Sequence, residues 1–485
     1  MTCFLLHQDK KEAALFASNF SWSSGTYVPA PWPAVTVQWG ECGLSCKESR
    51  TIVLNGSEAI ENATDRDIWP GVLAEAGIPT VHTVRGLTAK STNIRRYMAV
   101  VFQQEVLALY EANGQRLWLH DRVMDTEESY QEITMDSGQR TIRRLLSYAV
   151  RSIYSLGLDF GAVYVGVDTR GQTAVLAVRP TFPKIGEINR KFQCAVETFI
   201  AGYEQSYTRT VMIGADIEFV LRTPGGKMVM ASHYFPRDGI VGCDRVWWRG
   251  DITRRQFPIA ELRPAPADTP RGLFRNVYRA MCRGIQLIGP SNLAWEAGGM
   301  PLRGYPIGGH IHFSEIPCNA RLLRALDTYV ALPLLLLENE ASRARRPKYG
   351  QLGDMRPQFH GGFEYRTLPS FIVSPRITRG VLALAHLIAR VYRKLPVRGL
   401  FLIPELHHAF YTGQQDVLLP YVAELWEDLE SLPEYKEYEA YIAPFRELVA
   451  LRAVWEEHVD IRMAWKLPPF QPDMIVNRTH EPSML

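Results

Sequence analysis

Apolar residues follow either a helical or a strand-like spacing along the first 186 residues. Up to residue 50, short apolar stretches are interrupted by Pro29, Pro31 and Pro33, which favours strands and loops over helices. Beyond that point the two spacings alternate. The pattern predicts helices at 57–77 and 140–156, two strands around Gln103-Gln104 within 96–110, and strands at 162–168 and 173–179.

The predicted pattern of helices and strands changes at two points in the rest of the chain. The spacing predicts a helix at 188–204, strands at 211–222, 258–263 and 308–314, helices near 319–338 and at 377–393, and long helices within 413–460. A break falls near 183–186, and the sequence becomes mostly helical after Pro375. We therefore expect three domains, 1–186, 187–400 and 401–485.

Composition narrows the class of protein without identifying it. The 485 residues suffice for two or three domains with sizeable cores, and 46% hydrophobic with 22% charged residues is ordinary for a globular enzyme. The net charge is only +3 and the Lys and Arg residues are dispersed, so nucleic acid is not expected as the main partner. Small or peptide-like ligands are the remaining expectation.

Neither a cysteine metal cage nor a membrane segment is expected. The seven cysteines are scattered, and the one close spacing, Cys42 to Cys46, lacks the second pair that a zinc cage needs. The N-terminus has no basic flank before a long apolar core, and apolar runs such as 331–337 are too short to span a bilayer. We expect a cytoplasmic protein with no membrane partner.

Four strand-like segments between 211 and 370 each carry ionisable residues two positions apart. They are Asp216-Ile217-Glu218, Glu261-Leu262-Arg263, His310-Ile311-His312 and Glu364-Tyr365-Arg366. Residues i and i+2 of a strand share a face, while the apolar residue between them faces the core. One such triplet is usually a solvated strand face, but four of them favour one shared site. If the strands form one sheet, one face carries carboxylates, histidines and arginines together.

This set of side chains is typical of phosphoryl transfer. Carboxylates with histidines suit Mg²⁺ or Mn²⁺, whereas arginines suit phosphate or carboxylate oxygens. A basic run follows the third strand: Arg343, Arg345, Arg346, Lys348 and Arg356. Alone this run could be a solvated loop, but next to the cluster it is interpreted as a clamp for the triphosphate of ATP. Gly308-Gly309 and Gly361-Gly362 would let a nucleotide approach the backbone.

These segments resemble a known superfamily. The pieces are GADIEF (214–219), AELRPAP (260–266), GGHIHFS (308–314) and RRPKYGQLGDMRPQFHGGFEYRTLPS (345–370). Together they are similar to the glutamine synthetase and glutamate–cysteine ligase superfamily, and within it to the phage-type COOH·NH₂ ligases, or type 2 amidoligases. The resemblance covers about 205–375. It implies an α+β fold with an antiparallel sheet that forms an open funnel around two or three divalent ions, with ATP entering from one end.

The resemblance also implies a role for each matching residue. The implied metal ligands are Asp216, Glu218, Glu261, His310 and Glu364. His312 is implied to face the nucleotide and, with Arg366 and the basic run, completes the predicted ATP-binding set. The implied catalytic residues are Glu218, Glu364 and Arg366, the last stabilising the transferred phosphoryl group. Asp216 stands where glutamine synthetases carry Glu and is one methylene shorter.

The implied reaction joins a carboxylate to an amine. Transfer of the γ-phosphoryl group of ATP to the carboxylate would give an acyl phosphate, which an amine then attacks to form an amide. The substrates would be amino acids, peptides or protein-attached groups; the base that deprotonates the amine and the oligomeric state stay open. Three alternatives also stay open: a guanidino-kinase-like phosphotransferase, a catalytically silent scaffold, and a zinc hydrolase that uses His310 and His312.

A second resemblance covers the first half. Residues 51–83 and 156–185 are similar to the entry region and the C-terminal strand pair of ATP-grasp ligases. Tyr164 stands where those enzymes have an acidic metal ligand, and Ala177 and Arg179 stand where they have a Glu-x-Asn pair. The segment between 83 and 95 is also too short for their nucleotide-covering subdomain. We therefore expect a degenerate ATP-grasp-like remnant that holds the partner substrate or only scaffolds, with an unrelated α/β domain as the alternative.

Overall fold

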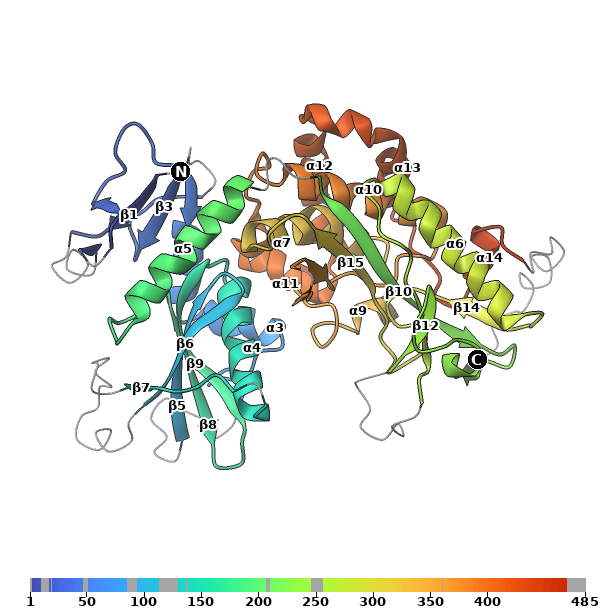
Figure 1. Ribbon diagram of the computed structural model, residues 1–485, viewed down its shortest axis with the longest axis horizontal. Helices are drawn as coiled ribbons and strands as arrows, with labels where there is room; N and C mark the ends of the chain where they lie inside the picture. Colours follow the sequence, from blue (N-terminus) through green and yellow to red (C-terminus); the bar gives the residue numbers. More distant parts are fainter. Residues whose placement is uncertain are drawn as a thin grey trace. The chain divides into compact units, whose positions relative to one another are not determined.

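The chain is a mixed α/β protein that divides into two compact units (Figure 1). The computed structural model describes residues 2–9, 17–18, 20–46, 51–84, 94–112, 130–136, 138–205, 210–245, 256–359 and 361–468. Unit 1 consists of Met1–Arg209, Pro317–Ala325 and Arg393–Thr412, and unit 2 of Thr210–Ile316, Leu326–Tyr392 and Gly413–Leu485. Helix α5 (Ile188–Gln205) thus groups with unit 1, together with two later segments that no sequence pattern indicated.

The N-terminal sheet of unit 1 is parallel. Its order is β2 (Ser23–Gly25), β1 (Cys3–His7), β3 (Val35–Trp39) and β4 (Ile52–Leu54). The prediction of one helix at 57–77 is wrong, because two helices occupy it, α2 (Ser57–Thr64) and α3 (Trp69–Glu75). Asp65 ends α2 in an extended conformation, and its carboxylate accepts a hydrogen bond from the amide of Asp67 at 2.7 Å. Pro70 has no amide hydrogen and therefore fits only the first turn of a new helix.

The second sheet of unit 1 is antiparallel and covered on both faces. Its order is β7 (Tyr130–Glu132), β6 (Glu105–Ala112), β5 (Ile94–Phe102), β8 (Phe160–Asp168) and β9 (Thr173–Arg179). The strands expected here and the helix expected at 140–156, which is α4 (Arg140–Ser155), are confirmed. Alternate residues of β5 enter two separate cores: Ala99 and Val101 pack with α4, and Val100 and Phe102 pack with α5. The strand period of two thus supplies an apolar residue to each face.

The sheet of unit 2 is antiparallel throughout its described pairs. Its order is β12 (Val241–Asp244), β13 (Ile259–Leu262), β10 (Met212–Arg222), β15 (Gly309–Ser314), β17 (Phe363–Tyr365) and β16 (Met355–Pro357), and both β11 (Met228–Val229) and β14 (Ala294–Glu296) pair with β10. The strands expected at 211–222, 258–263 and 308–314 are confirmed. Ile213, Ile217 and Phe219 of β10 are fully buried on one face, which leaves the alternate positions to the other.

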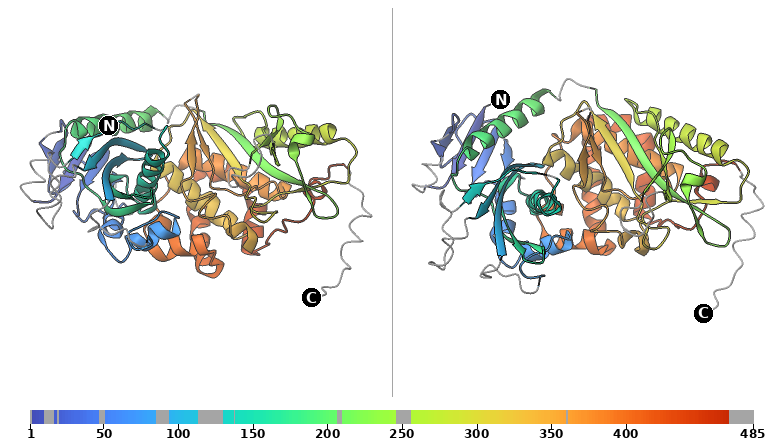
Figure 2. Two further views of the ribbon diagram at one scale, coloured as in Figure 1. Left: turned by 90° about the horizontal axis from the view of Figure 1, so that it is seen from below. Right: turned by 60° about the horizontal axis from the view of Figure 1, so that its bottom comes forward.

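Helices pack on the apolar face of that sheet. α6 (Pro270–Ile288) contacts β10, β12 and β13, and it lies beside α10 (Pro375–Val391) (Figures 1 and 2). The sequence analysis missed α6, although the Thr269 hydroxyl caps it by accepting a hydrogen bond from the amide of Gly272, and Pro270 begins its first turn.

Apart from α10, the described helices that follow α6 are short or lie toward the C-terminus. They are α7 (Ala320–Leu326), a π-helix (Asp327–Ala331), α8 (Leu332–Leu335), α9 (Glu340–Arg343), α11 (Pro404–Thr412), α12 (Gln415–Glu430), α13 (Glu439–Ala450) and α14 (Ile461–Ala464). Short 3₁₀ turns lie at Ala231–His233, Gly399–Phe401 and Pro433–Glu437.

The helices expected at 188–204, near 319–338, at 377–393 and within 413–460 are present. Within the described part of the chain, every helix falls short of the length and hydropathy that crossing a membrane requires. The segment between 83 and 95, on which the missing ATP-grasp subdomain was argued, lies mostly outside the described residues.

Candidate active site

The four charged segments lie side by side in the sheet of unit 2. The register places Glu218 of β10 opposite Glu261 of β13, and Asp216 opposite His310 of β15. His312 in turn lies opposite Glu364 of β17. Because paired residues and residues two apart share a face, one face of the sheet carries all of these side chains.

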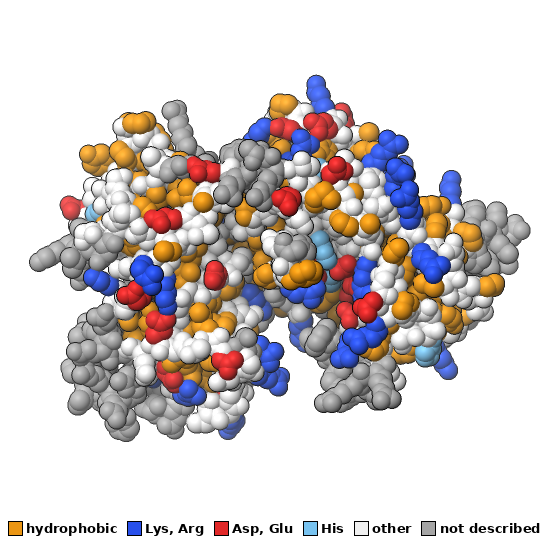
Figure 3. Space-filling model, in the orientation of Figure 1, with side chains coloured by type: hydrophobic (Ala, Val, Ile, Leu, Met, Phe, Trp, Pro, Cys, Tyr) orange, Lys and Arg blue, Asp and Glu red, His pale blue; other side chains and the backbone are white. Residues whose placement is uncertain are grey.

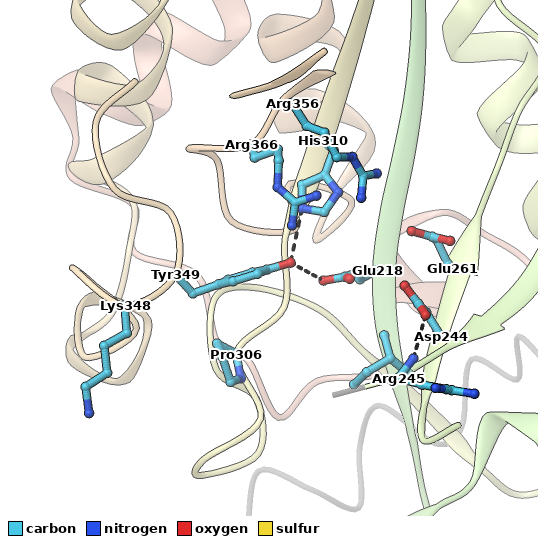
Figure 4. A pocket seen from close by; sticks show the side chains of 11 residues that line it. Glu218, Asp244, Arg245, Glu261, Pro306, His310, Lys348, Tyr349, Arg356 and Arg366 are labelled. Carbon is cyan, nitrogen blue, oxygen red and sulfur yellow. Dashed lines mark hydrogen bonds between the residues drawn. The ribbon is translucent and has the colours of Figure 1, made fainter. Parts of the chain in front are cut away.

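A pocket of about 190 Å³ opens on this face. Figure 4 shows the carboxylates of Glu218, Asp244 and Glu261 gathered on one side of it. Its basic lining residues are Arg245, Lys348, Arg356 and Arg366, and His310 and Tyr349 complete the polar lining. Lys348 points away from the carboxylates (Figure 4). The pocket therefore joins an anionic cluster to several cations, the combination that a metal–triphosphate complex requires.

Three carboxylates form the first candidate metal group. Oxygens of Glu218, Asp244 and Glu261 lie within 4.8 Å of one another. Burial, together with the negative charges of Asp216 and Glu218, raises the pKa of Glu261 to about 8. Burial likewise raises the pKa of Glu218. Such crowding of carboxylates is relieved by a divalent cation, and an all-oxygen donor set suits Mg²⁺ or Mn²⁺.

Asp216, His312 and Glu364 form the second candidate group, with ligand atoms within 4.8 Å of one another. The buried Nε2 of His312 lies 3.1 Å from Asp216 Oδ2 yet makes no hydrogen bond to any described residue. A buried nitrogen without such a bond beside two carboxylates fits a metal ligand. Glu364 is fully buried, which works to raise its pKa, but the hydrogen bond to His310 and the charges of Arg366 and Arg356 outweigh burial and lower the pKa to about 2.

His310 and Tyr349 connect the two groups. His310 Nδ1 lies 3.0 Å from Glu364 Oε1, and its Nε2 lies 3.1 Å from the Tyr349 hydroxyl. That hydroxyl donates to Glu218 Oε2 at 3.1 Å (Figure 4). The amide of Gly308 donates to the same oxygen at 2.6 Å. Burial, followed by the charge of Glu218, raises the pKa of Tyr349 well above its ordinary value, so the phenol stays protonated and donates. In this arrangement both nitrogens of His310 have partners, and His312 belongs to the metal group.

Two of the predicted phosphate-binding arginines line the pocket. Arg366 donates to Glu364 Oε1 at 2.9 Å, and its Nε lies 3.8 Å from Asp354 Oδ1. Arg356 lies directly opposite Glu364 in the sheet and donates to Glu364 Oε2 at 2.7 Å. Both guanidinium groups are thus within reach of the second metal group and of the pocket. Lys348 adds a third cation to its lining.

Arg345 and Arg346 lie elsewhere. The guanidinium group of Arg346 pairs with Glu338 at 2.8 Å, and both side chains are almost completely buried. Arg345 is buried too and donates to the carbonyl of Thr367, and burial lowers its pKa to about 10. Neither residue lines the pocket. These two arginines hold the segment between α9 and β16 in place, whereas the sequence analysis placed them on the triphosphate.

The sequence analysis missed three pocket residues. Asp244 lies two positions after Gly242, which is opposite Glu261, so Asp244 shares the charged face. Asp244 is the one charged residue of β12, so the pattern of charged residues two positions apart does not include it. Arg245 follows it directly. Tyr349 lies inside the motif of residues 345–370, but its uncharged side chain gave no signal.

Comparison with known proteins adds one firm result. Residues 213–467 match the family described as phage phiEco32-like COOH.NH2 ligase-type 2. No curated protein matches the chain. Among solved structures, a bifunctional glutathione synthetase from Pasteurella multocida is similar at 11% identity and a TM-score of 0.34, over 56% of this chain and 54%, about half, of that chain.

Two smaller ligases are similar over a shorter part of the chain. D-alanine–D-alanine ligase from Bacillus anthracis aligns at 9% identity and a TM-score of 0.28, over 40% of this chain and 92% of that one. The macrocyclase MdnC from Microcystis aeruginosa aligns at 9% identity and a TM-score of 0.27, over 41% of this chain and 100% of that one. At these scores the structural likeness supports no assignment of fold or function.

Proposed function

We propose that the chain, which belongs to the phage phiEco32-like COOH.NH2 ligase type 2 family, is an ATP-dependent carboxylate–amine ligase and that it activates the carboxylate in the pocket of unit 2. The observation that carries the proposal is the pair of metal-capable groups on one sheet face, with Arg356 and Arg366 lining the pocket on the same face. A solvated strand face would not bury Glu218, Glu261 and Glu364 together.

The donor atoms fit divalent metal ions. Glu218, Asp244 and Glu261 supply oxygens, and Asp216, His312 and Glu364 supply two carboxylates and a nitrogen. Mg²⁺ or Mn²⁺ bound there would neutralise charge on the triphosphate and on the transferred phosphoryl group. We propose His312 rather than His310 as the histidine ligand, because both nitrogens of His310 already have protein partners.

The chain's own residues bind and orient the reactants. Arg366, Arg356 and Lys348 provide the cations for phosphate oxygens. An oxygen of the substrate carboxylate attacks the γ-phosphorus of ATP, the bond to the bridging oxygen breaks, and ADP leaves. The amine then attacks the acyl carbon, inorganic phosphate leaves, and the amine loses a proton. Arg366 would stabilise the charge on the transferred group, and Tyr349 holds Glu218 in position for both steps.

The sheet of unit 2 would form the wall of an open funnel like that of glutamine synthetases, and the helices that follow Gly413 would form a helical extension of the same unit. Its antiparallel pairing supports this shape. We propose that unit 1 is an ATP-grasp-like remnant that holds the partner substrate or scaffolds the enzyme. Tyr164 pairs with Ala177 across β8 and β9, so two positions that are polar ligands in ATP-grasp ligases carry no carboxylate here.

Calorimetry with matched variants tests the location of the nucleotide. A non-hydrolysable ATP analogue with Mg²⁺ is titrated into the wild type, Glu261→Gln and Glu296→Gln. Glu296 is a control, because it is also a buried glutamate paired with an arginine of the same unit but does not line the pocket. We expect Glu261→Gln alone to weaken binding, by about tenfold or more. Equal weakening by both variants, or no binding by the folded wild type with carboxylate and amine substrates present, would contradict the proposal.

A further inference from the structure

Helix α6 carries a line of four arginines on its exposed side. Arg271, Arg275, Arg279 and Arg283 recur every fourth residue, and all four are exposed. Four residues advance an α-helix by ~6 Å and turn it by only ~40°, so the side chains form one stripe ~18 Å long. We call these four residues the arginine stripe. Figure 3 shows basic side chains gathered over the region that α6 occupies in Figure 1.

Among the residues that the structure describes, no acidic side chain neutralises the arginine stripe. α6 contains no Asp or Glu. Arg279 donates to Asn276 at 3.3 Å and Arg283 to Gln286 at 3.2 Å, both neutral amides on the same helix. Among the described residues, none forms an ion pair with any of the four arginines. Like charges four residues apart destabilise a helix. The arginine stripe therefore lowers the stability of α6, and no described acidic residue offsets this effect.

The stripe stands on a rigid support. The opposite side of α6 is buried through Leu273, Val277 and Met281 against the sheet and α10. Phe274 stacks on Trp465, and the guanidinium group of Arg379 from α10 lies 4.7 Å from the Phe274 ring. A further cation therefore lies beside the stripe. The four guanidinium groups lie along a helix that is already folded and packed. A partner can therefore bind them without first folding α6.

We infer that the arginine stripe is a docking surface for an acidic segment of a partner polypeptide. Guanidinium groups pair bidentately with carboxylates, and acidic residues at i, i+4 of a helix repeat at the same ~6 Å as the stripe. A duplex nucleic acid is expected to need a broad basic field, whereas this surface is one line on a chain of net charge +3. A bilayer would require protruding apolar residues, and only Tyr278 is an exposed large apolar residue on this helix.

This surface is separate from the catalytic pocket. None of the stripe arginines lines the pocket, and α6 packs on the face of the sheet that carries the apolar residues. Loss of docking should therefore leave ATP binding intact. A failure of this inference is distinguishable from a failure of the proposed function, because each has its own assay.

Fluorescence anisotropy with a labelled peptide tests the docking surface. The probe is a fifteen-residue helical peptide with Glu at every fourth position, and its Gln counterpart is the uncharged control probe. The full-length wild type is compared with Arg275→Gln/Arg279→Gln, with Arg275→Lys/Arg279→Lys, and with Arg140→Gln/Arg143→Gln on α4. The last pair is also exposed on one helix, at a spacing of three residues instead of four, but it lies in unit 1.

We expect the wild type to bind the Glu peptide and not the Gln peptide, more weakly as salt is raised. Arg275→Gln/Arg279→Gln should weaken this binding by tenfold or more, the lysine pair by less, and the unit 1 pair not at all. Binding of the Glu peptide that survives Arg275→Gln/Arg279→Gln overturns the inference. So does a wild type that ignores the peptide, or that binds duplex DNA or anionic phospholipid vesicles tenfold more tightly than the peptide.

Discussion

The two units each contain an antiparallel sheet, and the two sheets use the alternation of strand residues differently. In unit 1, β5 sends Ala99 and Val101 into one core and Val100 and Phe102 into another, so helices cover both faces. In unit 2, β10 buries Ile217 on one face and presents Asp216 and Glu218 on the other. A sheet covered on both faces gains stability but has no face left for a reaction. This difference supports the proposal that the chemistry takes place in unit 2.

We call the face of the unit 2 sheet that carries Asp216 and Glu218 the polar face. The strongest test of the difference between the two sheets is to remove a carboxylate from this face. Glu364→Gln should lower ATP-dependent amide formation on the order of 10³-fold or more, because Glu364 belongs to a metal group and contacts His310, Arg356 and Arg366. Circular dichroism and thermal melting check that the variant folds, and Glu296→Gln is the matched control. Activity within tenfold of the wild type in a folded Glu364→Gln protein would mean that the polar face is not the active site.

A smaller loss is expected when the guanidinium fork is replaced. Arg366→Lys keeps the positive charge but removes the two-pronged donor, so kcat should fall by about 10²-fold while KM for ATP changes little. Steady-state kinetics separates the two parameters. A rise in KM with unchanged kcat would show that Arg366 only binds ATP and does not act in phosphoryl transfer.

The hydroxyl that joins the two metal groups should matter less than either group. Tyr349→Phe removes the donor to Glu218 and the partner of His310 Nε2 while keeping the ring. We expect Mg²⁺ affinity to fall about 10- to 100-fold. Activity measured against Mg²⁺ concentration should recover at high metal. A loss of activity that metal cannot restore would give Tyr349 a direct role in the reaction.

The polar face also predicts that the thermal stability of the metal-free protein depends on pH through Glu261. The pKa of Glu261 is raised to about 8 in the folded protein by burial and neighbouring carboxylates. Its proton stabilises the metal-free protein at low pH, and this contribution is lost as pH rises through 8. Melting in EDTA should therefore occur at lower temperature at pH 9 than at pH 6, by a few degrees. Mg²⁺ or Glu261→Gln should reduce the difference, and an equal difference in Glu261→Gln would assign it to other groups.

The smallest effect is expected in unit 1. Tyr164→Ala should change ATP turnover less than about twofold, because β8 and β9 offer no carboxylate at the positions that bind metal in ATP-grasp ligases. Turnover is measured well below the melting temperature of the variant. A large loss of nucleotide affinity with the fold preserved would move part of the ATP site to unit 1.

The sequence predicted four strands of the polar face, β10, β13, β15 and β17, because local alternation determines them, but it did not predict β12 and β16. The register that joins Asp216 to His310 and His312 to Glu364 needed the fold, although each pair was visible as a charged triplet. Arg346 shows the limit of a charge pattern. Its partner Glu338 precedes it by eight residues, and the two side chains pair because both are buried. Tyr349 carries no charge and Asp244 stands alone on its strand, so neither produced a signal before the strands were brought together.

Helix α6 shows a different limit, because its signals were local and were nevertheless missed. Thr269 and Pro270 give an N-terminal cap and first turn, and Leu273, Val277 and Met281 repeat at helical spacing. The arginine stripe was missed with the helix, because dispersed charges align only when the helical period is applied.

Unit 1 is assembled from segments that are far apart in the gene. Asn62 of α2 donates to the carbonyl of Leu402 at 3.3 Å, Glu75 of α3 accepts from His407 at 3.1 Å, and Asp159 pairs with Arg324 at 3.2 Å. During translation all of these later partners are synthesised after Thr210–Ile316 of unit 2, and Leu402 and His407 also after Leu326–Tyr392. The contacts that close unit 1 can therefore form only after these later segments have been synthesised. A fragment that ends at Arg209 keeps both sheets of unit 1 but not the side chains and carbonyls that close them.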